Sequence, residues 1–376
     1  MAVMLMPELK EIFDHVYSSA DTSVPMSPQQ AKAFHMIRHC RSAKLGAHAM
    51  VCSECGSAQV SYNSCRNRHC PKCQHAVQED WVQSQLAKLL PVGYFHVVFT
   101  LPHELNPLLL HNQKLLYSLL IRAASHTLVE LAKDSKYLGA AIGLTSVLHT
   151  WGRNLSFHPH VHVIVPGGGL SANGLRFVRS RKKFFIPVKV VSNKFRGKFL
   201  YFLKKAYTDS KLEFFHEAAS LATPSNFASL IDSLYAKKWV VFCKKPFKSP
   251  EHVVRYLGRY THRVAISNSR IKFFDGKSVS FFWKDYKDKG KSKVMTLNAA
   301  EFTRRFLQHV LPDGFVKIRH YGLLCSRNIG TKLLRCRRLA KGKLPDFSTR
   351  PKVRYCPCCG SSKVIFVRQC FPSAVT

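Results

Sequence analysis

Acidic residues are scarce in this chain. Only 21 of its 376 residues are Asp or Glu, against 58 Lys and Arg, which gives a formal net charge of +37. A folded chain with this excess repels itself unless a polyanion neutralises it, so we expect nucleic acid as the partner. The basic residues are spread along the whole chain rather than gathered in one amphipathic helix, which argues against a membrane surface.

Long uncharged apolar runs are also missing, and none approaches the roughly 20 residues that span a bilayer. The first residues lack a basic leader and a cleavage-site pattern, which argues against secretion. We therefore expect a cytoplasmic, nucleoid-associated protein with no membrane partner. Because 46% of the residues are hydrophobic, the chain can bury one large core and carry one or two small modules.

Cysteine, by contrast, is abundant, and its spacing indicates metal binding. Thirteen cysteines in a chain expected inside the cell are thiols or metal ligands rather than disulfides. The knuckles Cys52-x2-Cys55 and Cys70-x2-Cys73 together predict one closed, structural Zn²⁺ site with four thiolate ligands. Basic residues between or beside these ligands are expected to hold DNA: Arg66, Arg68 and Lys72.

The leftover ligand types of this module also number four and suggest a second Zn²⁺: Cys40, His48, Cys65 and His69. The alternative is that Cys40 is a core residue and His48 a surface residue. Near the other end of the chain, Cys356 and Cys359 form a further knuckle with ligand spacing. The sequence supports either a half-site there or a site shared with another segment.

A histidine pair lies in the stretch from His158 to Val165. Successive strand residues alternate between faces, so His160 and His162 point to one face while the intervening valines point to the other. Two neutral imidazoles on one strand make a half-site for a divalent metal, Mg²⁺ or Mn²⁺, when DNA and water supply further ligands. The alternative is a histidine pair on a solvated strand face.

Tyr256 and Tyr260 are four residues apart in a predicted helix and therefore share a face. Tyrosine, with an ordinary pKa of about 10, is a poor nucleophile unless its charged form is favoured. A metal at the histidine pair would polarise the scissile phosphate and ease departure of the leaving oxygen. We predict a 5′-phosphotyrosyl link and a free 3′-hydroxyl; the alternative is two core residues on a buried helix stripe.

His252, one turn before Tyr256, is the predicted third ligand of this metal, and a capping or surface histidine is its alternative. The guanidinium groups that flank the tyrosines are expected to hold phosphate oxygens, although some will only be solvated: Arg255, Arg259 and Arg263.

Hydrophobic periodicity predicts an α+β fold, in which helices cover a mainly antiparallel sheet and a small zinc-binding module precedes it. We predict a helical lead-in and zinc module over residues 1–90 and a catalytic domain over residues 91–310. A basic C-terminal segment follows over residues 311–376.

Several long stretches resemble the insertion sequence 91 family of transposases, members of the His-hydrophobe-His (HUH) endonuclease superfamily. They are YNSCRNRHCPKC at 62–73, FTLP at 99–102, HPHVH at 158–162 and YLGRYTHRVAISN at 256–268. The resemblance implies an antiparallel sheet with the HUH motif on a central strand. It also implies rolling-circle transposition through single-stranded DNA at element ends and target DNA, with Tyr256 and Tyr260 as nucleophiles and His160 and His162 as the metal pair.

Two other functions fit the same residues. A replication initiator or a relaxase-type nickase would use the same chemistry. A non-catalytic, zinc-containing nucleic-acid-binding protein would keep the histidine and tyrosine pairs as structural groups. A covalent protein–DNA adduct would separate this last function from the two enzymatic ones.

Overall fold

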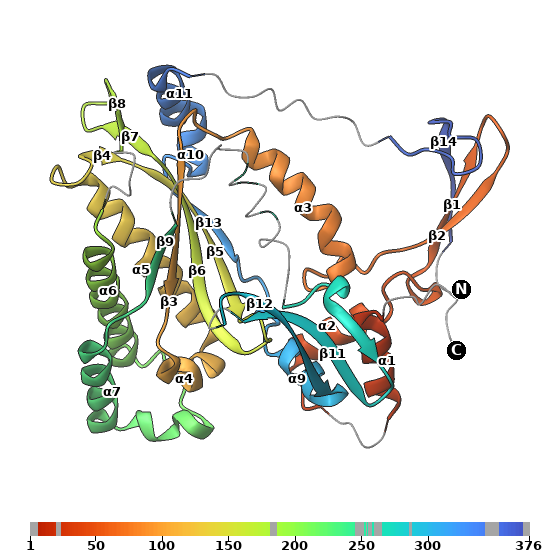
Figure 1. The fold of residues 1–376 in the computed structure, drawn as a ribbon, viewed down its shortest axis with the longest axis horizontal. Helices are drawn as coiled ribbons and strands as arrows, with labels where there is room; N and C mark the ends of the chain where they lie inside the picture. Colours follow the sequence, from red (N-terminus) through yellow and green to blue (C-terminus); the bar gives the residue numbers. More distant parts are fainter. Residues whose placement is uncertain are drawn as a thin grey trace.

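The computed structural model describes residues 7–19, 24–180, 186–244, 252, 254, 258, 265–285, 288–342 and 353–370. Its centre is a five-stranded sheet in which every pair of neighbouring strands is antiparallel (Figure 1). The order of the strands is β13 (Ile318–Gly322), β5 (Gly143–Trp151), β6 (Phe157–Pro166), β3 (Tyr94–Thr100) and β9 (Val241–Lys244). The histidine pair is on β6, the central strand, as the resemblance implied.

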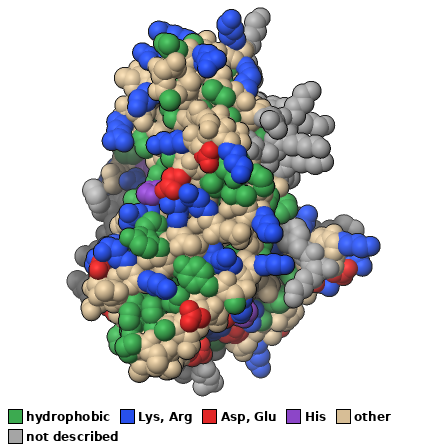
Figure 2. Space-filling model, turned by 90° about the vertical axis from the view of Figure 1, so that its left-hand side faces the viewer, with side chains coloured by type: hydrophobic (Ala, Val, Ile, Leu, Met, Phe, Trp, Pro, Cys, Tyr) green, Lys and Arg blue, Asp and Glu red, His purple; other side chains and the backbone are tan. Residues whose placement is uncertain are grey.

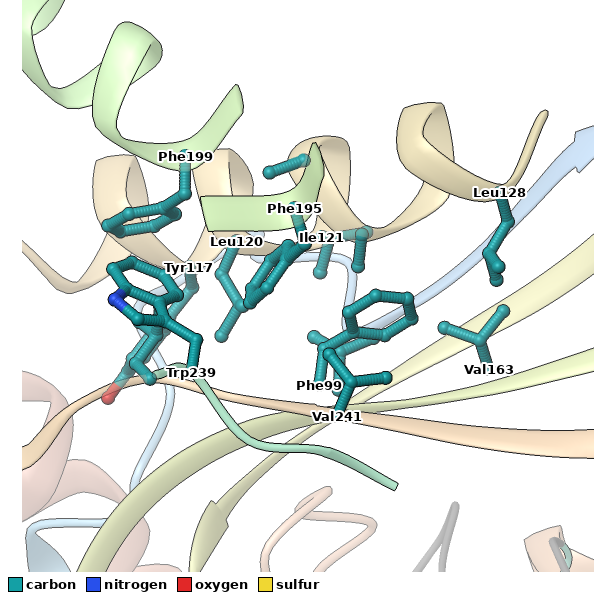
Figure 3. Close-up of a cluster of buried hydrophobic side chains, with 14 of the residues drawn as sticks. Phe99, Tyr117, Leu120, Ile121, Leu128, Val163, Phe195, Phe199, Trp239 and Val241 are labelled. Atoms are coloured by element: carbon teal, nitrogen blue, oxygen red, sulfur yellow. The ribbon is translucent and has the colours of Figure 1, made fainter. Parts of the chain in front are cut away.

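One face of this sheet is covered by helices and forms the largest core. Val161, Val163 and Val165 of β6 are fully buried on this face. The covering helices are α5 (Gln113–Lys133), α6 (Val188–Thr208) and α7 (Pro224–Ala236). Figure 3 shows the aromatic rings of Phe195 and Phe199 directed from α6 toward the sheet. Each such buried side chain contributes roughly 1.5–3 kcal/mol relative to exposure.

Helix α5 is apolar and long enough to cross a membrane by length and composition, but 61% of its most apolar window is buried in the fold. Its inner residues, among them Leu120, Ile121 and Leu128, pack against the sheet in this same core. Its hydrophobicity is therefore explained by its central position between α6 and the strands (Figure 1).

The opposite face of the sheet carries α3 (Pro71–Leu86). Val82 and Leu86 of this helix share a smaller hydrophobic cluster with Tyr94 of β3 and Ile164 of β6. The Tyr94 hydroxyl accepts a hydrogen bond from the Leu90 amide at 2.8 Å, which fixes the turn between α3 and β3. One end of the histidine face is thereby covered.

A second structural unit combines the first residues with residues 265–310. The helices α1 (Leu9–Ser18), α2 (Pro28–Arg38) and α9 (Ala299–Leu307) pack against a three-stranded sheet. Its strands are β10 (Ile271–Phe274), β11 (Ser278–Asp285) and β12 (Lys291–Asn298). The β10–β11 turn contains Gly276 at φ +88°, a conformation that glycine adopts without steric cost.

A third small sheet joins the two ends of the chain. It has the order β14-β1-β2, with β1 (Ala47–Cys52), β2 (Ala58–Tyr62) and β14 (Val364–Cys370). The remaining helices and strands are α4 (Asn106–His111), β4 (Ala140–Ala141), β7 (Gly168–Ser171), β8 (Phe177–Arg179), α10 (Ser326–Asn328) and α11 (Leu334–Ala340).

The predicted α+β class with a mainly antiparallel sheet is confirmed. The boundaries at residues 90 and 310 stay predictions, although hydrophobic contacts cross both of them. Helices α1 and α2 share a core with β11 and α9, and Leu311 and Phe315 belong to the core of the central sheet. Figure 2 shows Lys and Arg side chains spread over the helical face of the molecule with few acidic groups among them, as expected from the net charge.

Candidate metal centres and DNA-contacting surface

Three imidazoles converge on the face of the sheet that α5 and α6 leave uncovered. His160 and His162 come from β6, and His149 comes from the neighbouring strand β5, where it pairs in register with His160. Their potential ligand nitrogens all lie within 4.8 Å of one another. The rings of His149 and His162 are 4.3 Å apart, centroid to centroid. Three nitrogens at this spacing can bind one divalent metal ion.

Hydrogen bonds select the ligand nitrogen of each β6 histidine. The Nδ1 of His160 lies 2.7 Å from the carbonyl oxygen of His158, and a carbonyl only accepts, so Nδ1 carries the proton. The Nδ1 of His162 is 2.7 Å from Nε2 of His96 on β3. The first contact leaves Nε2 of His160 as the metal-binding nitrogen, and Nε2 of His162 can bind the same metal when its Nδ1 donates to His96.

Burial keeps these imidazoles neutral. It lowers the pKa of His160 to about 4, and it lowers the pKa of His162 well below its usual value, with a further contribution from the charge of neighbouring imidazoles. Only the neutral ring binds a metal, so the cluster is ready for a ligand role near neutral pH. Among the described residues no carboxylate belongs to the group. Such a nitrogen-only set fits Mn²⁺ better than Mg²⁺, which prefers oxygen ligands.

The third histidine of this cluster is His149 rather than His252, the predicted third ligand. His252 is exposed and is not part of the cluster, whereas His149 is buried within it. His149 lies on β5, next to the histidine strand. Sequence reasoning could not find His149, because the register of two strands depends on contacts that the local sequence does not encode.

Tyr256 and Tyr260 lie outside the described residues, as do Arg255, Arg259 and Arg263. Two residues of the same segment, Val254 and Gly258, are described and have helical conformation. Val254 is buried in the cluster that contains Ile164, and Ile164 shares its face of β6 with His160 and His162. A Cβ atom on Gly258 would lie 2.3 Å from Val82 of α3. Val254 and Gly258 therefore lie on the histidine side of the sheet.

The cysteines of the N-terminal module are grouped differently from the prediction. Cys70 and Cys73, at the start of α3, meet Cys40 and Cys65 rather than the first knuckle. The Sγ of Cys73 is 3.5 Å from that of Cys40 and 3.6 Å from that of Cys65. All four are buried, because α2 and the start of α3 enclose them. This set is a closed tetrahedral site of the kind that structural Zn²⁺ occupies.

Cys52 and Cys55 instead meet Cys356 and Cys359 from the other end of the chain. The C-terminal knuckle thus belongs to a site shared with another segment, which was one of the two alternatives. The structure does not bring Cys52, Cys55, Cys70 and Cys73 together as the predicted single site, because the thiols of each knuckle meet a different partner pair. Spacing identified the knuckles but not their partners.

His48 and His69, assigned to the second Zn²⁺, are not among the clustered ligands. The buried His69 ring has both nitrogens engaged: Nδ1 donates to Asn67 Oδ1 at 3.1 Å, and Nε2 accepts from the Leu311 amide at 3.0 Å. His48 Nδ1 lies 3.1 Å from Asn63 Oδ1. Both histidines therefore act in local hydrogen bonding, and cysteines replace them as ligands.

The three basic residues predicted to hold DNA have different surroundings. Arg68 is half-buried and donates to the carbonyl oxygens of Phe315 at 2.6 Å and Pro312 at 3.2 Å, so it holds a loop. Lys72 forms an ion pair with Glu8 at 2.5 Å. Arg66 is exposed and lines a groove beside the β14-β1-β2 sheet. Of the three, only Arg66 is exposed.

That groove combines positive charge with aromatic rings. Its lining includes Arg41, Arg66 and Arg354, together with the exposed rings of Tyr62 and Phe366. Guanidinium groups that follow phosphates and rings that stack on bases are the common means of binding single-stranded nucleic acid. The groove is therefore a candidate DNA-contacting surface, built from both ends of the chain.

Comparison with known proteins gives a consistent result. The sequence matches the family described as "Putative transposase" over residues 143–331 and the family "Transposase zinc-binding domain" over residues 11–101. It is 42% identical over 379 residues to "Putative transposase y4qJ" of Sinorhizobium fredii (strain NBRC 101917 / NGR234). This match covers 96% of this chain and 95% of that protein. It is 29% identical over 324 residues to "Transposase for insertion sequence element IS801" of Pseudomonas savastanoi pv. phaseolicola, covering 85% of this chain and 75% of that protein. No solved structure matches. The zinc-binding match and the cysteine clusters support the predicted structural Zn²⁺.

Proposed function

The chain belongs to the insertion sequence 91 family of transposases, and from this premise we propose that it nicks and rejoins single-stranded DNA through a 5′-phosphotyrosine intermediate. A transposase acts on DNA, which fits the net charge of +37. The finer proposal concerns how the strand is cut, which side chain is the nucleophile and which metal assists.

One observation carries the proposal: the histidine cluster shares one side of the central sheet with Val254 and Gly258, the described residues that flank Tyr256 in sequence. Val254 packs in the cluster that includes Ile164, two residues along β6 from His162. Tyr256 lies between Val254 and Gly258 in sequence. Packing of Val254 and Gly258 on the opposite face, with α5 and α6, would have argued against the proposal.

The chemistry assigned to the side chains conserves the energy of the cut bond. The hydroxyl oxygen of Tyr256 or Tyr260 forms a bond to phosphorus, the bond from phosphorus to the 3′ oxygen breaks, and that oxygen leaves as a hydroxyl. Attack by a 3′-hydroxyl on the phosphotyrosine reverses these changes and rejoins a strand. His149, His160 and His162 would hold Mn²⁺ or Mg²⁺, which when bound would stabilise the charge that develops on the phosphate. Arg255, Arg259 and Arg263 are proposed to hold phosphate oxygens.

A labelled-strand experiment tests the proposal. The full chain is incubated with Mn²⁺ and single-stranded DNA from either end of the element, labelled at its 3′ end or at its 5′ end. We expect the 3′ label to remain with the protein after denaturation, since the tyrosine takes the 5′ phosphate of the downstream fragment. The 5′-labelled fragment is expected free, with a 3′ end that a polymerase extends.

Variants identify the nucleophiles in the same experiment. The double variant Tyr256→Phe/Tyr260→Phe should form no adduct, while Tyr201→Phe, which alters an exposed tyrosine on α6, should form the wild-type amount. An adduct that carries the 5′ label, or one that persists in the double variant, would contradict the proposal. No adduct with any single-stranded substrate would favour the non-catalytic DNA-binding protein.

A further inference from the structure

Four cysteines from opposite ends of the chain meet in one cluster. Cys52 and Cys55 lie at the end of β1 and in the turn after it, and Cys356 and Cys359 lie in the turn before β14. Their sulfur atoms all lie within 4.8 Å of one another. Two of the contacts join the ends directly, with Sγ–Sγ distances of 3.6 Å for Cys52–Cys359 and 3.7 Å for Cys55–Cys356.

These distances distinguish between the two bonds that cysteines can form. A disulfide places its sulfurs about 2.05 Å apart, far closer than observed. A tetrahedral Zn²⁺ with Zn–S bonds of about 2.3 Å separates its sulfur ligands by roughly 3.8 Å. The observed separations therefore match the edges of a tetrathiolate metal site.

The two turns that supply the thiols are nearly identical in sequence and in hydrogen bonding. Both have the pattern Cys-x2-Cys-Gly-Ser. The glycine amide donates to the carbonyl of the first cysteine at 2.9 Å in each turn, from Gly56 and from Gly360. Both glycines have left-handed φ, +68° and +73°, which lets the backbone turn sharply around the metal position. Two matched knuckles that face each other form a complete zinc ribbon.

Hydrophobic burial contributes little to this part of the fold. Strand β14 pairs with β1 from Ala47↔Cys370 to Cys52↔Val364. Yet Ile365, Phe366 and Val367 of β14 remain 55%, 62% and 56% exposed. Small sheets with so little buried surface are marginal in water, so another interaction must hold the strand in place. A structural metal provides that stabilisation in many small modules.

We propose that Cys52, Cys55, Cys356 and Cys359 bind a second structural Zn²⁺, which joins the C-terminal end of the chain to its N-terminal zinc module. Cys40, Cys65, Cys70 and Cys73 form the first site. The second site lies partly outside the matched family regions, which end at residues 101 and 331. It also completes the groove, because Arg354 and Phe366 are held beside Arg41 and Arg66 only while β14 stays paired.

Metal analysis of the full chain is the first test. The wild-type protein should contain two zinc ions per chain, and Cys356→Ser/Cys359→Ser should contain one. Cys358→Ser is the matched control: Cys358 is exposed in the same turn but absent from the cluster, so this variant should keep two ions. One zinc ion in the wild type, or two in the double variant, would overturn the proposal.

The second test needs no cysteine variant and so does not depend on how a variant folds. A specific protease site is inserted between Gly342 and Val353 of the full chain, and the purified protein is cut there. The C-terminal fragment should stay bound to the remainder during gel filtration and should separate after a zinc chelator is added. Separation before chelation, or continued association once zinc has been removed completely, would overturn the proposal.

Discussion

The imidazoles of the histidine cluster are oriented by neighbours that are not themselves ligands. The His158 carbonyl fixes the proton on His160, and His96 bonds to His162. His149 stacks on Trp151, with ring centroids 4.7 Å apart and an interplanar angle of 22°. Because an imidazole nitrogen binds a metal through a lone pair that lies in the plane of the ring, such contacts determine whether three imidazoles act as one site.

The proposed metal site predicts different results for two histidine variants. We expect His149→Ala to reduce adduct formation with Mn²⁺ by roughly 100-fold or more, because it removes one of three ligands. His252→Ala should change it less than a few-fold, because His252 is exposed and outside the cluster. Calorimetric titration of Mn²⁺ should show the same order in affinity. Equal losses of adduct formation in the two variants would mean that His252 is also a metal ligand.

His309 predicts a pH dependence of stability. It is buried in the turn after α9, beside the β5–β6 turn, where its ring lies 3.2 Å from Thr150 Oγ1 and from the Leu155 carbonyl oxygen. Burial lowers the pKa of His309 from its usual 6.5 to about 3. The unfolded chain therefore binds this proton first as the pH falls, so the stability contributed by the neutral ring is lost between pH 6.5 and 3.

Because of this one group, the free energy of unfolding is expected to fall by about 1.4 kcal/mol for each pH unit below 6.5. Between pH 6.5 and 5, the free energy of unfolding should thus fall by about 2 kcal/mol more in the wild type than in His309→Gln. Urea unfolding at the two pH values measures the difference. His103→Gln, at a side chain that is 87% exposed, should keep the wild-type slope; an unchanged slope in His309→Gln would refute the assignment.

At the level of elements, the contact between α3 and the segment of Val254 and Gly258 fixes one end of the histidine face. Gly258 has no Cβ, and this permits a close approach to Val82, which is 2% exposed. Val82 is β-branched and has few rotamers, so it cannot move aside easily. A larger residue at position 258 would therefore force Gly258 and α3 apart.

Gly258→Ala should lower the free energy of unfolding by about 1–3 kcal/mol, since overpacking costs more than the gain in helix propensity. Adding Val82→Ala should restore part of the lost stability, because it removes the methyl group that the new Cβ atom would contact. The matched control is Gly197→Ala in α6, where an added Cβ would meet no atom within 4 Å. This control should stabilise the chain by about 0.5–1 kcal/mol; a stabilised Gly258→Ala variant would show that the contact is loose.

Across the whole molecule, the excess of positive charge is distributed rather than local. Lys and Arg side chains are found over the helical face in Figure 2 as well as around the groove near β14. A distributed field attracts DNA without orienting it, whereas the groove adds rings that can stack on bases. Orientation and affinity are therefore expected to depend on different residues.

Binding of single-stranded DNA at several salt concentrations separates these contributions. The triple variant Arg41→Ala/Arg66→Ala/Arg354→Ala should reduce the slope of log affinity against log salt by about 2, for three phosphate contacts on a single strand. Lys204→Ala, on α6 at the opposite side of the molecule in Figure 1, should leave the slope nearly unchanged. Equal effects would mean that the groove has no special part in binding.

The sequence by itself determined the α+β class, the histidine strand and the presence of metal-binding cysteine knuckles. These features depend on residues close together in the chain, where strand alternation, turn glycines and ligand spacing act directly. Tertiary structure alone decided which groups meet: His149 with His160, Cys70 with Cys40, and Cys52 with Cys359. Each of these pairings depends on strand register or on the return of a distant segment. A thiol or an imidazole binds whichever partner the fold brings within reach, and local sequence does not specify that partner.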